Sequence, residues 1–279
     1  MIRKILFLYL LSGILTVTAL LLIAAEPSEL DMLLSEGQEL FQQASNTADE
    51  ENARILYQKA LYRFQTIVER GQVNNGKLFY NMGNTYYRLG DIGRAILFYR
   101  RAQLIIPADP NLKHNLRYVR SQRKDLVPTR QDSLVLRTLF FWHSSSPPRV
   151  KLSIFITFFW GACLLAVLTL LQANRNKRWK RAFLAFCSGI ALLMLISLIT
   201  DEIRLRTLKD GVITTEEVVA RKGDGIAYQR SFVEPLHQGT EFTLLEERAG
   251  WYYIELSDGR TGWIPASAAE MVIQGMRGV

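Results

Sequence analysis

The sequence predicts a multidomain α+β membrane protein: a helical repeat module, a transmembrane helical hairpin and a small C-terminal β-barrel. Three observations carry this prediction. A helix-pair pattern occupies residues 26–126, two long uncharged apolar runs follow it, and short alternating runs separated by turns begin at Asp210. The 279 residues provide room for about two soluble domains, and much of the 49% hydrophobic content lies in the apolar runs.

Residues 1–25 are predicted to be a signal peptide or a signal anchor. The basic start Arg3-Lys4 precedes the apolar run Ile5–Ala25, which ends in small residues before Glu26. The run is also long enough to cross a bilayer, so cleavage and retention both stay open.

Residues 76–107 carry a helix–turn–helix pattern. Its residues recur at characteristic spacings: Phe79, Met82, Gly83, Tyr86, Gly90, Ala95, Tyr99, Ala102 and Pro107. Gly83 and Ala95 are small where two antiparallel helices would cross, and the pattern resembles a tetratricopeptide repeat. A degenerate helix pair at 28–44 and 51–70 and a capping helix at 111–126 extend it. Residues 26–126 are therefore predicted to be a tetratricopeptide α-solenoid.

One face of the first helix in this repeat is predicted to line a groove that binds a peptide or partner protein. The residues at the required spacing are Lys77, Tyr80, Asn84, Tyr87 and Arg88. An asparagine with a lysine and an arginine would suit a carboxylate. The tyrosines would equally suit packing against the next repeat, and both interpretations stay open.

The capping helix carries a basic stripe on the face opposite its apolar residues. Lys113, Arg117, Arg120 and Lys124 follow one another at helical spacing. The stripe would suit anionic headgroups or an acidic partner, or it would simply be solvated. The linker 127–151 then includes the aromatic stretch Leu136–Trp142, which would lie at the headgroup level or pack as a buried helix.

Residues 152–173 and 182–200 are the two predicted membrane spans. Neither contains a charged residue, and they correspond to about 33 and 28 Å of helix. The loop 174–181 between them is strongly basic and is expected in the cytoplasm by the positive-inside rule. The protein is thus predicted in the inner (cytoplasmic) membrane with both soluble domains on the periplasmic side. The spans lack ionisable groups, which favours anchoring over transport.

Residues 210–279 are predicted to form a small barrel with five strands, at 216–220, 226–228, 241–246, 251–256 and 262–265. Within this segment the run LHQGTEFTLLEERAGWYYIELSDGRTGWIPASAAEMV resembles bacterial SH3-like domains. The resemblance implies an aromatic groove for cell-wall peptides, with Trp251, Tyr253 and Trp263 as candidates, although both tryptophans would also suit a core. Alternation separates Tyr252, Ile254 and Leu256 from these residues without showing which set faces inward.

The residues needed for catalysis or metal binding do not cluster in the sequence. His114, His143 and His237 fall in three different segments, and Cys163 and Cys187 both lie inside the predicted spans. We therefore expect no enzyme activity, no cofactor and no metal. The net charge of +8 comes largely from residues flanking the spans, and with the expected compartment this disfavours nucleic acid as a partner.

The order of these parts resembles BatE-type proteins of the Bacteroides aerotolerance operon. Asn81, Asn115 and the stretch Asp109-Pro110-Asn111-Leu112 are also similar to that family. The resemblance implies other membrane proteins as partners, namely von Willebrand A-domain Bat proteins with a MoxR-type ATPase, and a role in aerotolerance or stress. Two functions follow: a non-enzymatic scaffold acting through the groove, or a module that senses peptidoglycan through the SH3-like domain.

Overall fold

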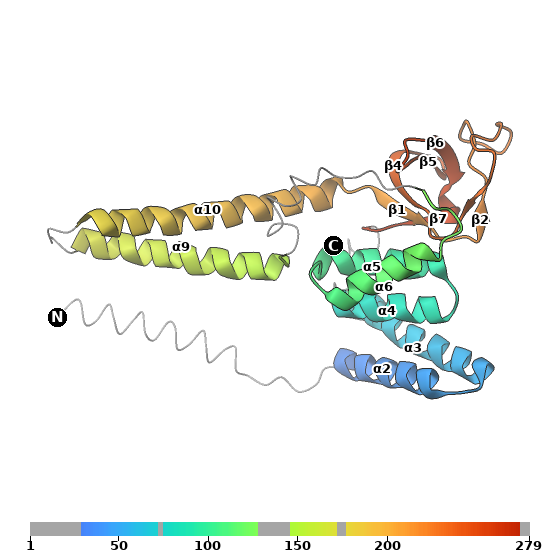
Figure 1. The fold of residues 1–279 in the computed structure, drawn as a ribbon, viewed down its shortest axis with the longest axis horizontal. Helices are drawn as coiled ribbons and strands as arrows, with labels where there is room; N and C mark the ends of the chain where they lie inside the picture. The colour runs from blue at the N-terminus through green and yellow to red at the C-terminus, as the bar shows by residue number, and fades with distance from the viewer. Residues whose placement is uncertain (1–28, 72–74, 128–145, 172–176, 274–279) are drawn as a thin grey trace.

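The computed structural model describes residues 29–71, 75–127, 146–171 and 177–273. They form a helical module, a hairpin of two long helices and a C-terminal β domain (Figure 1). The fold is therefore a mixture of helices and antiparallel sheet, as predicted. The predicted signal segment and the aromatic stretch Leu136–Trp142 lie outside the described residues.

The helical module, residues 29–127, is built from five helices that pack successively on one another: α2 (Glu29–Asn46), α3 (Glu50–Gly71), α4 (Gly76–Arg88), α5 (Ile92–Ile105) and α6 (Pro110–Ser121). Side-chain caps begin the last three helices. Asn75, Asp91 and Asp109 accept hydrogen bonds from backbone N–H groups of the first turns.

The predicted crossing of two helices at small residues is confirmed. A Cβ atom on Gly83 would lie 2.6 Å from the ring of Tyr99, and Ala95 is fully buried. The inward residues predicted for the capping helix, Leu112, Leu116 and Val119, are buried as well, although α6 ends earlier than predicted.

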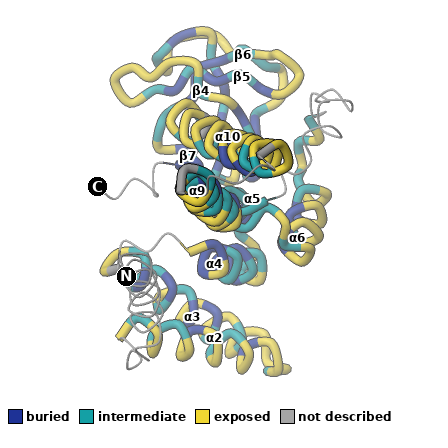
Figure 2. The backbone as a smooth tube through the Cα atoms, turned by 90° about the vertical axis from the view of Figure 1, so that its left-hand side faces the viewer, coloured by how far each residue is buried: buried dark blue, intermediate teal, exposed yellow. Residues whose placement is uncertain are grey.

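The hairpin consists of α9 (Pro148–Leu171) and α10 (Lys177–Thr207), which lie side by side (Figure 1). Both helices are long and apolar enough to cross a membrane. Many residues of both helices are exposed (Figure 2). Large apolar side chains, such as those of Trp160 and Leu192, are among them. Residues 177–181, predicted as loop, already belong to α10, and this helix continues past Thr200 to Thr207.

The β domain, residues 210–273, contains seven short strands: β1 (Asp210–Ile213), β2 (Glu217–Val218), β3 (Leu236–His237), β4 (Glu241–Arg248), β5 (Trp251–Leu256), β6 (Thr261–Pro265) and β7 (Ala269–Met271). Antiparallel pairing gives one sheet in the order β6-β5-β4-β1-β7 and a separate β2-β3 pair. The strands described here do not close into the predicted barrel.

Two details of the predicted β domain needed correction. Residues 226–228 were expected to be a strand but form a turn, in which Ile226 is 80% exposed and has no sheet partner among the described residues. Strands β1, β3 and β7 were missed because each is short. Alternation along β5 did not show which of its two faces points inward. The structure shows that it is the face with Tyr252, Ile254 and Leu256, because all three are buried in the domain core.

Candidate functional site

The five residues predicted to line the groove all lie on α4, but they are exposed to different degrees. Lys77 and Arg88 are exposed at its two ends, whereas Tyr80, Asn84 and Tyr87 are half-buried between them. The two charged groups are therefore the ones that solvent reaches most easily.

Asn84 is held in a hydrogen-bond network between three helices. Its Oδ1 atom accepts a hydrogen bond from the Tyr99 hydroxyl at 2.7 Å and another from Asn115 Nδ2 at 3.0 Å. Asn115 Nδ2 also donates to the Tyr80 hydroxyl oxygen at 3.0 Å. Burial raises the pKa of Tyr99, so its phenol remains protonated and able to donate. Tyr80 and Asn84 thus connect α4 with α5 and α6.

Lys77 and Tyr87 contact α6 and its N-cap residue as well. Lys77 Nζ lies 2.5 Å from Asp109 Oδ2, and this hydrogen bond holds the pKa of Asp109 below its usual value. The ring of Tyr87 meets Tyr118 edge-on at 5.8 Å, and hydrogen bonding with Tyr118 raises the pKa of Tyr87. A ligand that used Lys77 would therefore compete with an existing ion pair.

A hollow of about 230 Å³ lies where α2, α3 and α4 meet. Its lining consists of amide side chains and phenylalanine rings: Gln38, Phe41, Gln42, Phe64, Asn81 and Asn84. Amide groups both donate and accept hydrogen bonds, as a peptide backbone does. Phe64 is fully buried, so Phe41 is the ring of this lining that a ligand could reach. The hollow therefore suits an extended polypeptide whose backbone meets the amides and whose apolar side chain meets Phe41.

Of the lining residues, only Asn84 was among the predicted groove residues. Gln38, Phe41 and Gln42 were missed because the first helix pair departs from the repeat pattern. A signal for them exists in Gly37, whose Cβ position would lie 2.5 Å from the ring of Phe64, much as Gly83 meets Tyr99. If Gly37 is taken as the equivalent of Gly83, these three residues become the equivalents of Asn84, Tyr87 and Arg88.

The outer surface of the β sheet carries a second candidate site, the aromatic face formed by Trp251, Tyr253 and Trp263. Tyr253 stacks on Trp263 with ring centroids 5.0 Å apart, and Arg248 lies over the same tryptophan at 5.1 Å. Trp263 is 7% exposed, whereas Trp251 and Tyr253 are half-exposed. Any ligand would thus touch Trp251 and Tyr253 more than Trp263.

The basic stripe predicted on the capping helix is divided between two environments. Arg120 donates two hydrogen bonds of 2.7 Å to Glu241 of the β domain, and Lys124 Nζ lies 2.8 Å from His237 Nε2. Lys113 and Arg117 are exposed. The acidic partner of Arg120 is thus part of the same chain.

No metal site is found in the part of the chain that the structure describes. None of its groups of histidine, cysteine, aspartate and glutamate residues has three or more members placed to hold an ion.

Residues 235–272, most of the β domain, match the family model described as the variant SH3 domain. A comparison with curated proteins finds no match to the chain. The C-terminal β domain is therefore SH3-like, which indicates a protein-interaction module.

Proposed function

We propose that this protein is a non-enzymatic, membrane-anchored scaffold that assembles an envelope protein complex through the groove of its helical module. The observation that carries the proposal is the hollow between α2, α3 and α4, where several amide side chains lie together with the partly exposed ring of Phe41. Within this proposal the helical module is a tetratricopeptide solenoid, and an extended segment of a partner protein lies along the groove.

The hairpin supports the anchoring part of the proposal. Helices α9 and α10 separate the two soluble parts in the sequence, yet the β domain contacts α5 and α6 directly. The segments before and after the hairpin must therefore share one side of any membrane that it crosses. This is the arrangement expected of two consecutive spans.

The charge between the spans supports a periplasmic location. Basic residues from Arg175 to Arg181 would lie in the cytoplasm by the positive-inside rule, so the soluble domains would face the periplasm from the inner membrane. The resemblance to BatE-type proteins names other membrane proteins, such as von Willebrand A-domain Bat proteins, as partners, and aerotolerance or stress response as the process.

The alternative function is peptidoglycan sensing through the β domain. The half-exposed rings of Trp251 and Tyr253, with Trp263 and Arg248 beside them, form an aromatic surface that suits a cell-wall fragment. This alternative requires no groove ligand, so the two functions make different predictions.

Crosslinking and affinity capture from membranes would separate the two functions. We would compare the intact protein with a variant in which the exposed groove residues Gln38, Gln42 and Arg88 are replaced by alanine. None of these three replacements removes a buried side chain, so circular dichroism should show a folded protein. Loss of specific protein partners supports the scaffold, whereas retention of the same partners by the folded variant contradicts it.

A further inference from the structure

The contact between the β domain and the helical module includes shared apolar core. Val212 of β1 and Val272, just after β7, are fully buried and belong to the hydrophobic cluster of the helices rather than to that of the β domain. Figure 1 places the β domain over α5 and α6, at the end of the module away from α2. Two segments of the β domain therefore complete the core of the helices.

Two glycines, one from each side, allow the backbones to approach closely. A Cβ atom on Gly93 of α5 would lie 2.6 Å from the carbonyl oxygen of Ile213, which is backbone and has little freedom to move. Gly239 has φ of +86°, and a Cβ atom there would lie 3.0 Å from Ile96 of α5. Such a fit indicates a specific contact between the two parts.

The charges across the contact are complementary. Glu241 Oε2 lies 2.7 Å from Arg120 and 3.5 Å from Arg100, and its other oxygen lies 3.3 Å from Arg123. Burial opposes ionisation of Glu241, but these guanidinium groups outweigh it and hold the pKa of Glu241 below its usual value. Arg100 also pairs with Asp210 of β1. One carboxylate thus joins both α5 and α6 to the sheet.

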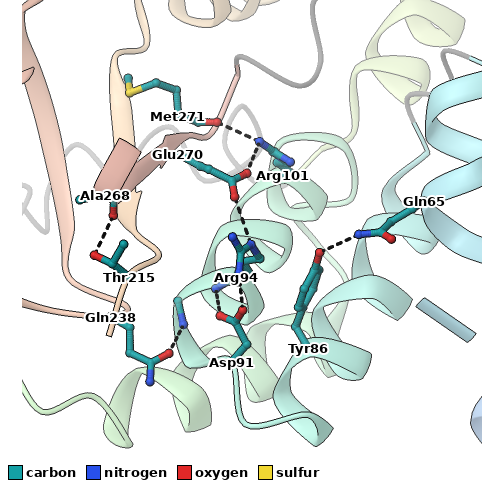
Figure 3. Close-up of polar contacts among 11 residues, drawn as sticks. Gln65, Tyr86, Asp91, Arg94, Arg101, Thr215, Gln238, Ala268, Glu270 and Met271 are labelled. Atoms are coloured by element: carbon teal, nitrogen blue, oxygen red, sulfur yellow. Dashed lines mark hydrogen bonds and ion pairs between the residues drawn. The ribbon is translucent and has the colours of Figure 1, made fainter. Parts of the chain in front are cut away.

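Figure 3 shows a second group of arginine contacts on α5. Arg94 Nε lies 3.2 Å from Glu270, and the buried Arg101 donates hydrogen bonds of 3.1 and 3.0 Å to the carbonyl oxygens of Val272 and Met271. Met271 is the last residue of the edge strand β7, and Val272 follows it. The helices therefore also satisfy backbone groups of the β domain.

Asp125, just after α6, fixes the remaining corner of the contact. Its carboxylate accepts hydrogen bonds from the backbone N–H of His237 at 2.6 Å and from the Thr240 hydroxyl at 2.7 Å, and it lies 2.9 Å from His237 Nδ1. With Lys124 at the other ring nitrogen, His237 has a partner on both sides. The end of the helical module is thereby tied to the turn before β4.

We propose that the β domain is the terminal cap of the helical module, so that the surface of α5 and α6 beneath it is occupied by the chain itself. A stacked helical module leaves the apolar face of its last helix open unless something covers it. Here α6 is the last helix of the module in the described residues, and β1, residues 237–241 and residues 271–272 cover α5 and the end of α6. External partners are thereby excluded from the surface of α5 and α6 that lies beneath the β domain.

Gly93→Ala tests the cap directly. The substitution should slow amide exchange in the helices if they do not need the β domain, and should speed it if they do. Alanine favours a helix more than glycine does, so helices that did not need the β domain would exchange their amide hydrogens more slowly. If the β domain is the cap, the clash with Ile213 separates it, and amides of Leu116 and Val119 in α6 exchange at least about tenfold faster. The measurement uses the detergent-solubilised full chain, with Gly161→Ala in α9, which has open space around it, as control.

Unchanged or slower exchange in α6 of the Gly93→Ala protein would overturn the proposal. If that variant does not fold, Glu241→Lys is compared with Glu247→Lys, which places the same charge change at an exposed position of the same strand. Exchange in α6 that is about tenfold faster for Glu241→Lys alone supports the cap. Equal exchange in the two variants overturns it. The outcome is independent of groove binding, so it does not depend on the scaffold function.

Discussion

Replacing Glu241 by glutamine should destabilise the soluble part of the protein substantially. The change keeps the size of the side chain but removes the negative charge shared by Arg100, Arg120 and Arg123. Breaking a buried ion pair from one side costs about 3–5 kcal/mol. Glu241 is partly exposed and glutamine retains one acceptor oxygen, so we expect the lower end of that range, about 3 kcal/mol. If the helical module and the β domain unfold together, a loss of this size lowers their Tm by about 6–12 °C.

Thermal unfolding of the detergent-solubilised protein, followed by circular dichroism at pH 7, measures this effect. Glu247→Gln is the matched control, because Glu247 is exposed on the same strand and should change stability by less than about 0.5 kcal/mol. Equal Tm values for the two variants would refute a stabilising role for the cluster that Glu241 forms with Arg100, Arg120 and Arg123.

The same cluster predicts how stability changes with pH. The pKa of Glu241 in the folded protein lies below its usual value of 4.5, because the surrounding guanidinium groups outweigh the effect of burial. Its contribution is therefore complete above that value and is lost as pH falls through the lower folded pKa. The Tm difference between the native protein and Glu241→Gln should be constant near neutral pH and shrink in acid. A difference that grew in acid would contradict this sign.

Three further predictions concern other parts of the chain. Tyr253→Ala removes one ring of the aromatic face, so sedimentation with peptidoglycan should fall about tenfold if the face binds the wall, and unchanged sedimentation would argue against that alternative. Asp201→Asn removes the 2.6 Å ion pair with the buried Lys151 between α10 and α9; we expect the hairpin to lose about 3 kcal/mol, seen as faster maleimide labelling of the buried Cys187. Gly83→Ala overpacks the helix crossing and should cost about 1–3 kcal/mol in chemical denaturation, with no loss at all contradicting the observed packing.

The sequence predicts the helices well where periodic apolar residues and small crossing residues repeat. Gly83 and Ala95 led to the correct crossing of α4 and α5, and the apolar period of the capping helix identified Leu116 and Val119 as buried. These features are local, because residues three or four positions apart share a helix face. The two apolar helices of the hairpin follow equally from composition.

The strands were predicted less well, because several contain only two to four residues. Alternation over Trp251–Leu256 identified β5 and its two faces, but it could not show that Tyr252 faces the core. The turn at 226–228 was mistaken for a strand because its residues favour β structure. It forms no strand because these residues have no sheet partner among the described residues.

Contacts between distant segments were beyond the reach of periodicity. The basic stripe was visible as a pattern, yet nothing in the spacing of Arg120 and Lys124 pointed to Glu241 and His237, more than a hundred residues later. The network of Asn84, Tyr99 and Asn115 likewise needs three helices in place. Side chains that look available for a ligand in the sequence already have partners in the fold.

Photocrosslinking in native membranes tests the central claim, groove-based assembly, most directly. A photoreactive phenylalanine analogue is placed at exposed Gln42 in the groove and, in a separate protein, at Tyr62, which is 63% exposed on α3 and does not line the hollow. The scaffold function predicts a discrete protein adduct from position 42 and none from position 62. Adducts of equal yield from both positions, or none from position 42, would contradict it.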